Sequence, residues 1–110
     1  MDYKSAGVDI NAGNKAVERI KKGVQSTFTT NVLTGLGSFG SLYDLKSIID
    51  NYENPVLVQS IDGVGTKTII ARKLGKFNTI GVDLLSACAN DILVMGARPL
   101  TFLDYIANDK

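Results

Sequence analysis

Apolar side chains recur at helical spacing in several stretches of this chain. The strongest pattern spans residues 84–95 and predicts a helix that ends at Gly96, with Pro99 preventing any continuation. Intervals of three, four and three residues place one set of side chains on its buried face: Leu85, Cys88, Ile92 and Met95. Cys88 is expected to be a small buried residue rather than a reactive thiol.

Two shorter helices are predicted nearer the start of the chain, after an arm at residues 1–13. Asn14 is expected to cap the first, which carries one apolar stripe and is weakened near its end by Gly23; the stripe consists of Val17, Ile20 and Val24. The second begins after a capping Thr66, runs to Leu74 and stops at Gly75.

Between the helices the pattern favours loops and strands. Residues 25–41 are polar and glycine-bearing and predict a long loop, whereas Val56–Ile61 is rich in β-branched residues and predicts the clearest strand. Shorter strands are expected at 79–82 and 100–107. Residues 39–45 fit a short strand or the start of a helix through Ile48 and Ile49; the strand is favoured, followed by a helical turn that ends at Asn54-Pro55. We therefore predict an α+β fold, with helices in one layer against one sheet.

Composition limits the chemistry that is open to this chain. A length of 110 residues fits one domain, and 12 basic against 11 acidic residues, a net charge of +1, argue against nucleic acid and anionic membranes as partners. The sequence contains neither a membrane-spanning apolar run nor a signal peptide, so we expect a cytoplasmic protein. With one cysteine and no histidine, chemistry must rest on carboxylates, lysines, hydroxyls, amides and backbone N–H groups, which suit phosphate and magnesium.

The segment Asp62–Lys67 is a candidate phosphate site. Glycines at 63 and 65 let backbone N–H groups approach an anion, and the helix that follows adds partial positive charge. Lys67 can pair with phosphate oxygens and Asp62 can hold magnesium. A tight turn with positive φ at Gly63 or Gly65 explains the same residues. The segment is not a P-loop, because Thr66 precedes the lysine where that motif needs glycine.

Three further features are open to a functional or a structural interpretation. Residues 35–40 match G-x-G-x-x-G, but the dinucleotide-binding fold requires a strand before this motif and a helix after it, and neither is predicted here. The motif therefore favours a loop that folds over phosphates, with an ordinary surface loop as the alternative. On the helix at 84–95 and just before it, Asp83 and Asn90 share a face, and Asp91 lies at the border with the apolar face, where a carboxylate needs a partner. Asp83 is equally explained by the helix dipole. Asp104 needs a partner only if its face is buried.

These motifs, taken in order along essentially the whole chain, resemble the N-terminal half of the phosphoribosylformylglycinamidine cyclo-ligase family, the aminoimidazole ribonucleotide synthetases. The most specific are Asp62–Lys67 and the Asn90-Asp91 element; the others are residues 3–10 with 12–14, Gly37–Gly40, 80–84 and 102–105. The resemblance implies ATP- and magnesium-dependent ring closure of formylglycinamidine ribonucleotide in purine biosynthesis. It also implies a mixed, mainly antiparallel sheet that pairs across a homodimer into a barrel.

The resemblance further implies roles for individual residues. Asp62, Lys67 and Asp91 would be catalytic, and Asp62 and Asp91 would hold Mg²⁺. ATP would also contact Gly37, Ser38, Phe39, Gly40, Gly63, Gly65, Thr66, Asp83 and Asn90. Ser38, Ser41 and Ile61 depart from residues that are common in the family. The family's enzymes continue into a second domain, so residues 1–110 are expected to be the N-terminal ATP-binding domain. A sister enzyme of the superfamily and a non-catalytic dimerisation module are the alternatives.

Overall fold

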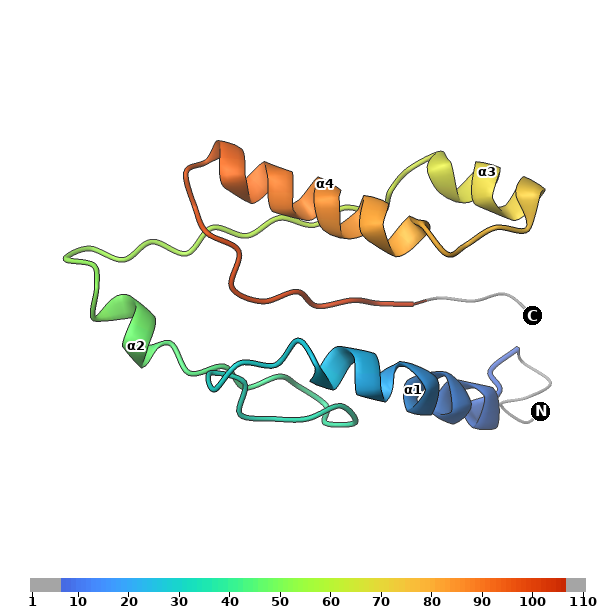
Figure 1. Cartoon of the computed structure of the whole chain (residues 1–110), viewed down its shortest axis with the longest axis horizontal. Helices are drawn as coiled ribbons and strands as arrows, with labels where there is room; N and C mark the ends of the chain where they lie inside the picture. Colours follow the sequence, from blue (N-terminus) through green and yellow to red (C-terminus); the bar gives the residue numbers. More distant parts are fainter. Residues whose placement is uncertain (1–6, 107–110) are drawn as a thin grey trace. The chain divides into compact units, whose positions relative to one another are not determined.

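The computed structural model describes residues 7–106, which form four helices (Figure 1): α1 Ile10–Gln25, α2 Lys46–Ile49, α3 Lys67–Leu74 and α4 Ile80–Val94. None of these helices is long and apolar enough to cross a membrane. The chain divides into two compact units, Met1–Pro55 with Ala107–Lys110, and Val56–Ile106, and each is described by itself. Residues 3–6 of the family-like opening, and Ala107, lie outside the described residues.

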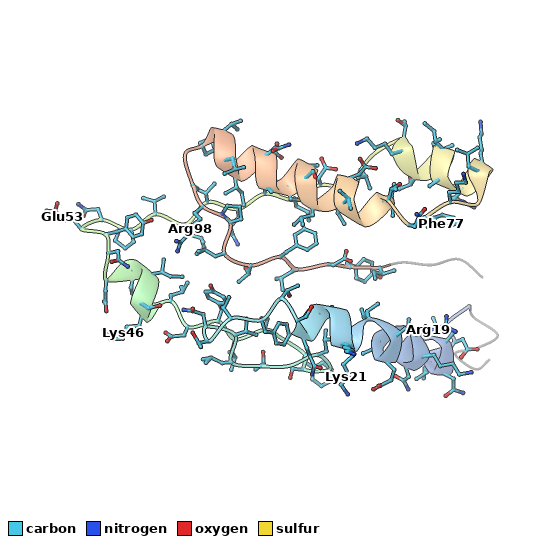
Figure 2. All side chains as sticks on the ribbon, viewed as in Figure 1. Arg19, Lys21, Lys46, Glu53, Phe77 and Arg98 are labelled. Atoms are coloured by element: carbon cyan, nitrogen blue, oxygen red, sulfur yellow. The ribbon has the colours of Figure 1, made fainter. Side chains whose placement is uncertain are left out.

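In the first unit, α1 begins five residues earlier than the pattern predicted, with its N-cap at Asp9 instead of Asn14. Asp9 is the N-cap residue, and its carboxylate accepts hydrogen bonds from the N–H groups of Asn11 and Ala12, at 2.9 and 3.1 Å. The prediction that Asn14 caps this helix is therefore wrong. An acidic N-cap satisfies two N–H groups that the first turn leaves open, so the helix extends back through residues 10–14, which precede the apolar stripe. Figure 2 shows Arg19 and Lys21 on this helix.

The rest of the first unit is a loop that closes on itself before α2. Val32 and Tyr43 form an isolated antiparallel bridge, and the N–H of Leu33 donates to the carbonyl of Leu42 at 2.9 Å. The Asn31 side chain adds two hydrogen bonds, to the carbonyl of Asp44 at 2.7 Å and to the Ser47 hydroxyl at 3.0 Å. The loop predicted for residues 25–41 is confirmed in outline, and its ends are tied together next to α2.

The second unit consists of an extended segment at 56–66, α3, α4 and a second extended segment at 97–106. Helix α3 packs against α4, and the buried side chains of the described residues are Ala71 on α3 and Cys88 on α4. Gly75 ends α3 with φ 61°, a left-handed conformation that a side chain would strain. The predicted ends of α3 and the burial of Cys88 are therefore confirmed.

Helix α4 also begins earlier than predicted. Thr79 is its N-cap residue, and the N–H groups of Val82 and Asp83 already donate to the Thr79 carbonyl, at 3.1 and 3.2 Å. The strand predicted at 79–82 is wrong because these residues continue into a long apolar helix, and tertiary context overrides the weak preference of Ile80 and Val82 for strands. The predicted buried face is only partly correct, since Leu85 is 50% and Met95 71% exposed.

The predicted α+β fold is wrong for this structure, because residues 7–106 contain no sheet and no barrel. Val56–Ile61 is extended, yet its backbone joins no neighbouring strand, and Val56 and Ile61 are 84% and 95% exposed. Residues 100–106 are likewise extended and unpaired within the described chain, and 39–45 contributes only the bridge at Tyr43. A β-strand forms only when its N–H and C=O groups pair with those of a second strand. A pattern of β-branched residues does not specify which segment provides that second strand.

Candidate functional site

The loop Asp62–Thr66 turns the chain from its extended segment into α3. The Asp62 carboxylate accepts a hydrogen bond from the N–H of Val64. Val64 and Gly65 both have positive φ, 57° and 52°. Glycine adopts this region freely, whereas a β-branched residue in it is a clear outlier and costs about 1–2 kcal/mol. The loop is therefore a constrained turn. Its left-handed residues are 64 and 65, so that Gly65 but not Gly63 meets the conformational prediction.

The loop leads directly into the N-terminus of α3. Thr66 is the N-cap residue, as predicted, but its side chain makes no capping hydrogen bond. The hydroxyl of Thr68 instead donates to the carbonyl of Gly65 at 2.9 Å, which fastens the loop to the first turn. No side chain caps α3, and the N–H groups of Lys67 and Ile69 already donate to the carbonyls of Val64 and Thr66, at 3.3 and 3.1 Å. The positive end of the helix dipole still favours an anion at this terminus.

Lys67, the first residue of α3, is paired with an acid of α4. Its Nζ lies 2.8 Å from Oδ1 of Asp83, and the two side chains are 57% and 38% exposed. Sequence reasoning placed both residues at the site but did not pair them. The Asp83 carboxylate lies in the first turn of α4, where the helix dipole favours a negative charge. Asp83 is therefore an acid in the first turn of a helix and the ion-pair partner of Lys67, while its contact with ATP stays a prediction.

Asp91 has a hydrogen-bond partner on the extended segment. The hydroxyl of Ser60 donates to Asp91 Oδ2 at 2.9 Å, across 31 residues of sequence. The expectation that a carboxylate at the border of the apolar face needs a partner is met, although Asp91 is exposed rather than buried. Ser60 is the residue that sequence reasoning missed. Its position two residues after Val58 in an extended segment places it on the same side as that residue, but nothing local indicated Asp91 as its partner.

These two contacts flank the Asp62–Thr66 loop and attach it to the same helix. Ser60 precedes the loop and bonds to Asp91 near the end of α4, whereas Lys67 follows the loop and bonds to Asp83 near its beginning. The segment therefore runs antiparallel to α4, as Figure 1 shows for the yellow-green trace beside the orange helix. In this way the fold brings a turn, two acids of α4 and one lysine into a single region.

Asp62 and Asp91 carry carboxylate oxygens, the kind of ligand that magnesium prefers. Asp62 uses Oδ1 and Asp91 uses Oδ2 for the hydrogen bonds described above, so each carboxylate has a second oxygen to offer. Within residues 7–106 no group of three or more histidine, cysteine or acidic side chains could hold a metal ion. An ion held by Asp62 and Asp91 would then need water or phosphate ligands as well, which is the way magnesium is usually bound in nucleotide sites.

The glycine-rich loop belongs to the first unit. The N–H of Leu42 donates to the Thr34 hydroxyl at 2.9 Å, which closes residues 35–41 into a loop. Gly37 has φ 100°, which only glycine adopts without strain, and Phe39 is fully exposed. Among the described residues no strand precedes this loop, and α2 begins only at Lys46, so a dinucleotide-binding fold is excluded for the G-x-G-x-x-G match.

The remaining candidates lie on exposed surface. Asn90 is exposed on α4 beside Asp91, and Asp104 is exposed in the extended segment after α4. Because its face is open to solvent, Asp104 needs no partner. Figure 2 labels Arg98, near the start of that segment. The second unit thus contains Asp62, Gly63, Gly65, Thr66, Lys67, Asp83, Asn90 and Asp91, and the first contains Gly37, Ser38, Phe39 and Gly40.

Comparison with known proteins gives concordant matches. Residues 43–110 match the family model described as "AIR synthase related protein, N-terminal domain". Over all 110 residues the chain is 54% identical to proteins named phosphoribosylformylglycinamidine cyclo-ligase from Xanthomonas campestris pv. campestris (strain B100) and Thermoanaerobacter pseudethanolicus. The match covers 100% of this chain and 31% and 32% of those proteins, so the chain spans about a third of the length of these curated relatives.

Proposed function

We infer a function for this chain from its family: it belongs to the AIR synthase related proteins, and residues 43–110 match their N-terminal domain. The proposed function is the MgATP-binding part of a phosphoribosylformylglycinamidine cyclo-ligase. That enzyme would close formylglycinamidine ribonucleotide to aminoimidazole ribonucleotide in purine biosynthesis. The 54% identity to relatives of that name, over the whole chain, supports the assignment.

One structural observation supports the assignment of the proposed nucleotide site to particular residues. The constrained loop Asp62–Thr66 is flanked by the contacts Lys67–Asp83 and Ser60–Asp91. A phosphate site needs backbone N–H donors, a cation and oxygen ligands for magnesium, and this region offers all three. The observation is independent of the family match, because it rests on contacts between segments far apart in sequence.

Each side chain has a distinct part in the proposed site. The Lys67 ammonium would bind phosphate oxygens and stabilise charge on the transferred phosphoryl group. Backbone N–H groups of Gly63, Gly65 and Thr66 would contact phosphates. Asp62 and Asp91 would hold magnesium, which when bound neutralises phosphate charge, and Asn90 would support the ligand. Phosphoryl transfer would activate the amide oxygen of the substrate, and the amidine nitrogen would then displace phosphate.

The proposal includes a homodimer. Many large apolar side chains of the second unit are exposed, among them Val56 at 84%, Ile61 at 95% and Val94 at 82%. Such residues gain free energy when a second surface covers them. Sedimentation equilibrium of the purified protein would test this part, and a monomer at every concentration would contradict it.

Nucleotide titration would test the binding site. Affinity for a non-hydrolysable ATP analogue is measured with and without magnesium in the wild type and in Asp62→Ala and Asp91→Ala. We expect each variant to lose about tenfold or more of the magnesium-dependent gain, because one ligand carboxylate is missing. Asp104→Ala is the matched control, an exposed acid of the same unit, and should behave as the wild type. Unchanged magnesium-dependent binding in both test variants would refute the assigned site.

A further inference from the structure

Among the contacts of residues 7–106, one hydroxyl of the second unit donates to a carboxylate distant in sequence. It belongs to Ser60 and lies 2.9 Å from Asp91 Oδ2. We propose that Ser60 is a positioning residue that sets the orientation of the Asp91 carboxylate toward the Asp62–Thr66 loop. This inference rests on the proposed function, in which Asp91 is a magnesium ligand. It adds a residue that neither the motif nor the family resemblance identified.

The placement of Ser60 follows from the alternation of an extended chain. Val58 and Ser60 are half-buried, whereas Leu57 and Ile61 on the opposite side are 69% and 95% exposed. Alternate residues of an extended segment point to the same side, so Val58 and Ser60 share the side that faces the unit. The hydroxyl therefore reaches α4 from the side of the extended segment that faces the unit.

The chemistry explains why one hydroxyl matters. Asp91 is exposed on a helix, and an exposed carboxylate can rotate among several rotamers. A hydroxyl donor to one oxygen restricts this rotation through a charge-assisted hydrogen bond and leaves Oδ1 directed elsewhere. Partners of this kind orient metal ligands in general, and their loss weakens metal binding without removing a ligand. Ser60 adds no charge, so its effect must come through the orientation of Asp91.

The same contact also ties the extended segment to α4, and a purely structural role has to be separated from positioning. Ser60→Ala removes the donor, whereas Ser60→Thr keeps a hydroxyl at the same position. Ser86→Ala is the matched control, because Ser86 carries an exposed hydroxyl on α4, the helix that carries Asp91. An effect that depends on the hydroxyl should appear in Ser60→Ala and be absent from Ser60→Thr. Nonspecific loosening of the unit would appear in both variants.

The first measurement uses the magnesium-free protein and no nucleotide. The chemical shift of the Asp91 carboxyl carbon is recorded by NMR in the wild type and in the three variants. We expect Ser60→Ala to move this resonance, and Ser60→Thr and Ser86→Ala to leave it near its wild-type position. If Ser60→Ala leaves it unmoved, the contact does not orient Asp91, and the inference fails whatever the function of the protein.

The second measurement is the affinity for MgCl2 in the presence of a non-hydrolysable ATP analogue. We expect Ser60→Ala to weaken the apparent magnesium affinity about tenfold, Ser60→Thr to restore it, and nucleotide binding without magnesium to stay unchanged. If Asp91→Ala weakens magnesium binding but Ser60→Ala does not, the positioning role is wrong and the proposed function stands. If neither Asp62→Ala nor Asp91→Ala affects it, the proposed function fails together with this inference.

Discussion

Lys67 and Asp83 form an ion pair of 2.8 Å between Nζ and Oδ1, which joins the first residue of α3 to the first turn of α4. A lysine at the positive end of a helix dipole is unfavourable by itself, and the carboxylate of Asp83 offsets this. The same ammonium is the group that we propose to contact phosphate. Asp83 and a phosphate oxygen therefore compete for one cation.

This competition predicts that Asp83→Asn strengthens the binding of magnesium-free ATP by about two- to fivefold, because a partly exposed ion pair contributes a modest free energy. Lys67→Ala should weaken the same binding. Titration of each variant with ATP in the presence of a chelator measures both effects. Asp104→Asn, the same change of charge at an exposed position, is the control. Weaker binding by Asp83→Asn would mean that Asp83 holds Lys67 in place for phosphate instead.

The N-cap of α1 gives a second prediction. Asp9→Ala should lower the free energy of unfolding by about 1 kcal/mol, since its carboxylate accepts hydrogen bonds from two first-turn N–H groups. Asn14→Ala should be neutral or slightly stabilising, because position 14 lies inside the helix and alanine is the better helix former. Urea unfolding curves compare the two variants. A larger loss for Asn14→Ala would contradict the assignment of the cap.

Two glycines of opposite conformational role give a third prediction. Gly75→Ala should destabilise the protein by about 1 kcal/mol, because φ at this C-cap is 61°. Gly23→Ala should stabilise it by roughly 0.5–1 kcal/mol, because Gly23 lies within α1 and an added Cβ meets nothing within 4 Å. Both are measured by thermal or urea unfolding. Equal effects of the two substitutions would show that α3 does not end in a left-handed residue.

The single cysteine allows a direct test of burial in the second unit. Cys88 is 7% exposed on the side of α4 that carries the core, so its thiol should react slowly with an aromatic disulfide reagent in the native protein. Urea should raise the rate to that of a free thiol. Ala71→Glu, which places a charge at the other buried position, should also raise it by loosening the unit. Rapid labelling of the native wild type would contradict the packing described.

The sequence predicted the local features of the fold well. The bounds of α3, its stop at Gly75 and the burial of Cys88 follow from residues within a few positions of each other, and such short-range signals can be read directly. The start of α1 was missed because Asp9 begins this helix before the apolar stripe, and the start of α4 was missed because Ile80 and Val82 favour strands.

In the candidate site, too, local features were predicted and long-range contacts were missed. The motif Asp62–Lys67 and the acids of α4 were identified from residue types and from the family resemblance. The Ser60–Asp91 hydrogen bond was not, because a serine in an extended segment has no local feature that specifies a partner 31 residues away. The strain at Val64 was missed for a related reason. A β-branched residue predicts extended backbone, and only the surrounding turn holds it at φ 57°.

The helix positions, to within a few residues, and the family of the chain follow from the sequence alone, which also predicts the residues of the candidate site. The tertiary structure decided that Lys67 pairs with Asp83 and that Ser60 pairs with Asp91. It also decided that the β-branched segment Val56–Ile61 joins no sheet within the described residues. The physical reason is that a helix satisfies its hydrogen bonds within a few residues of its own chain, whereas an ion pair or a strand requires a distant partner that no local pattern names.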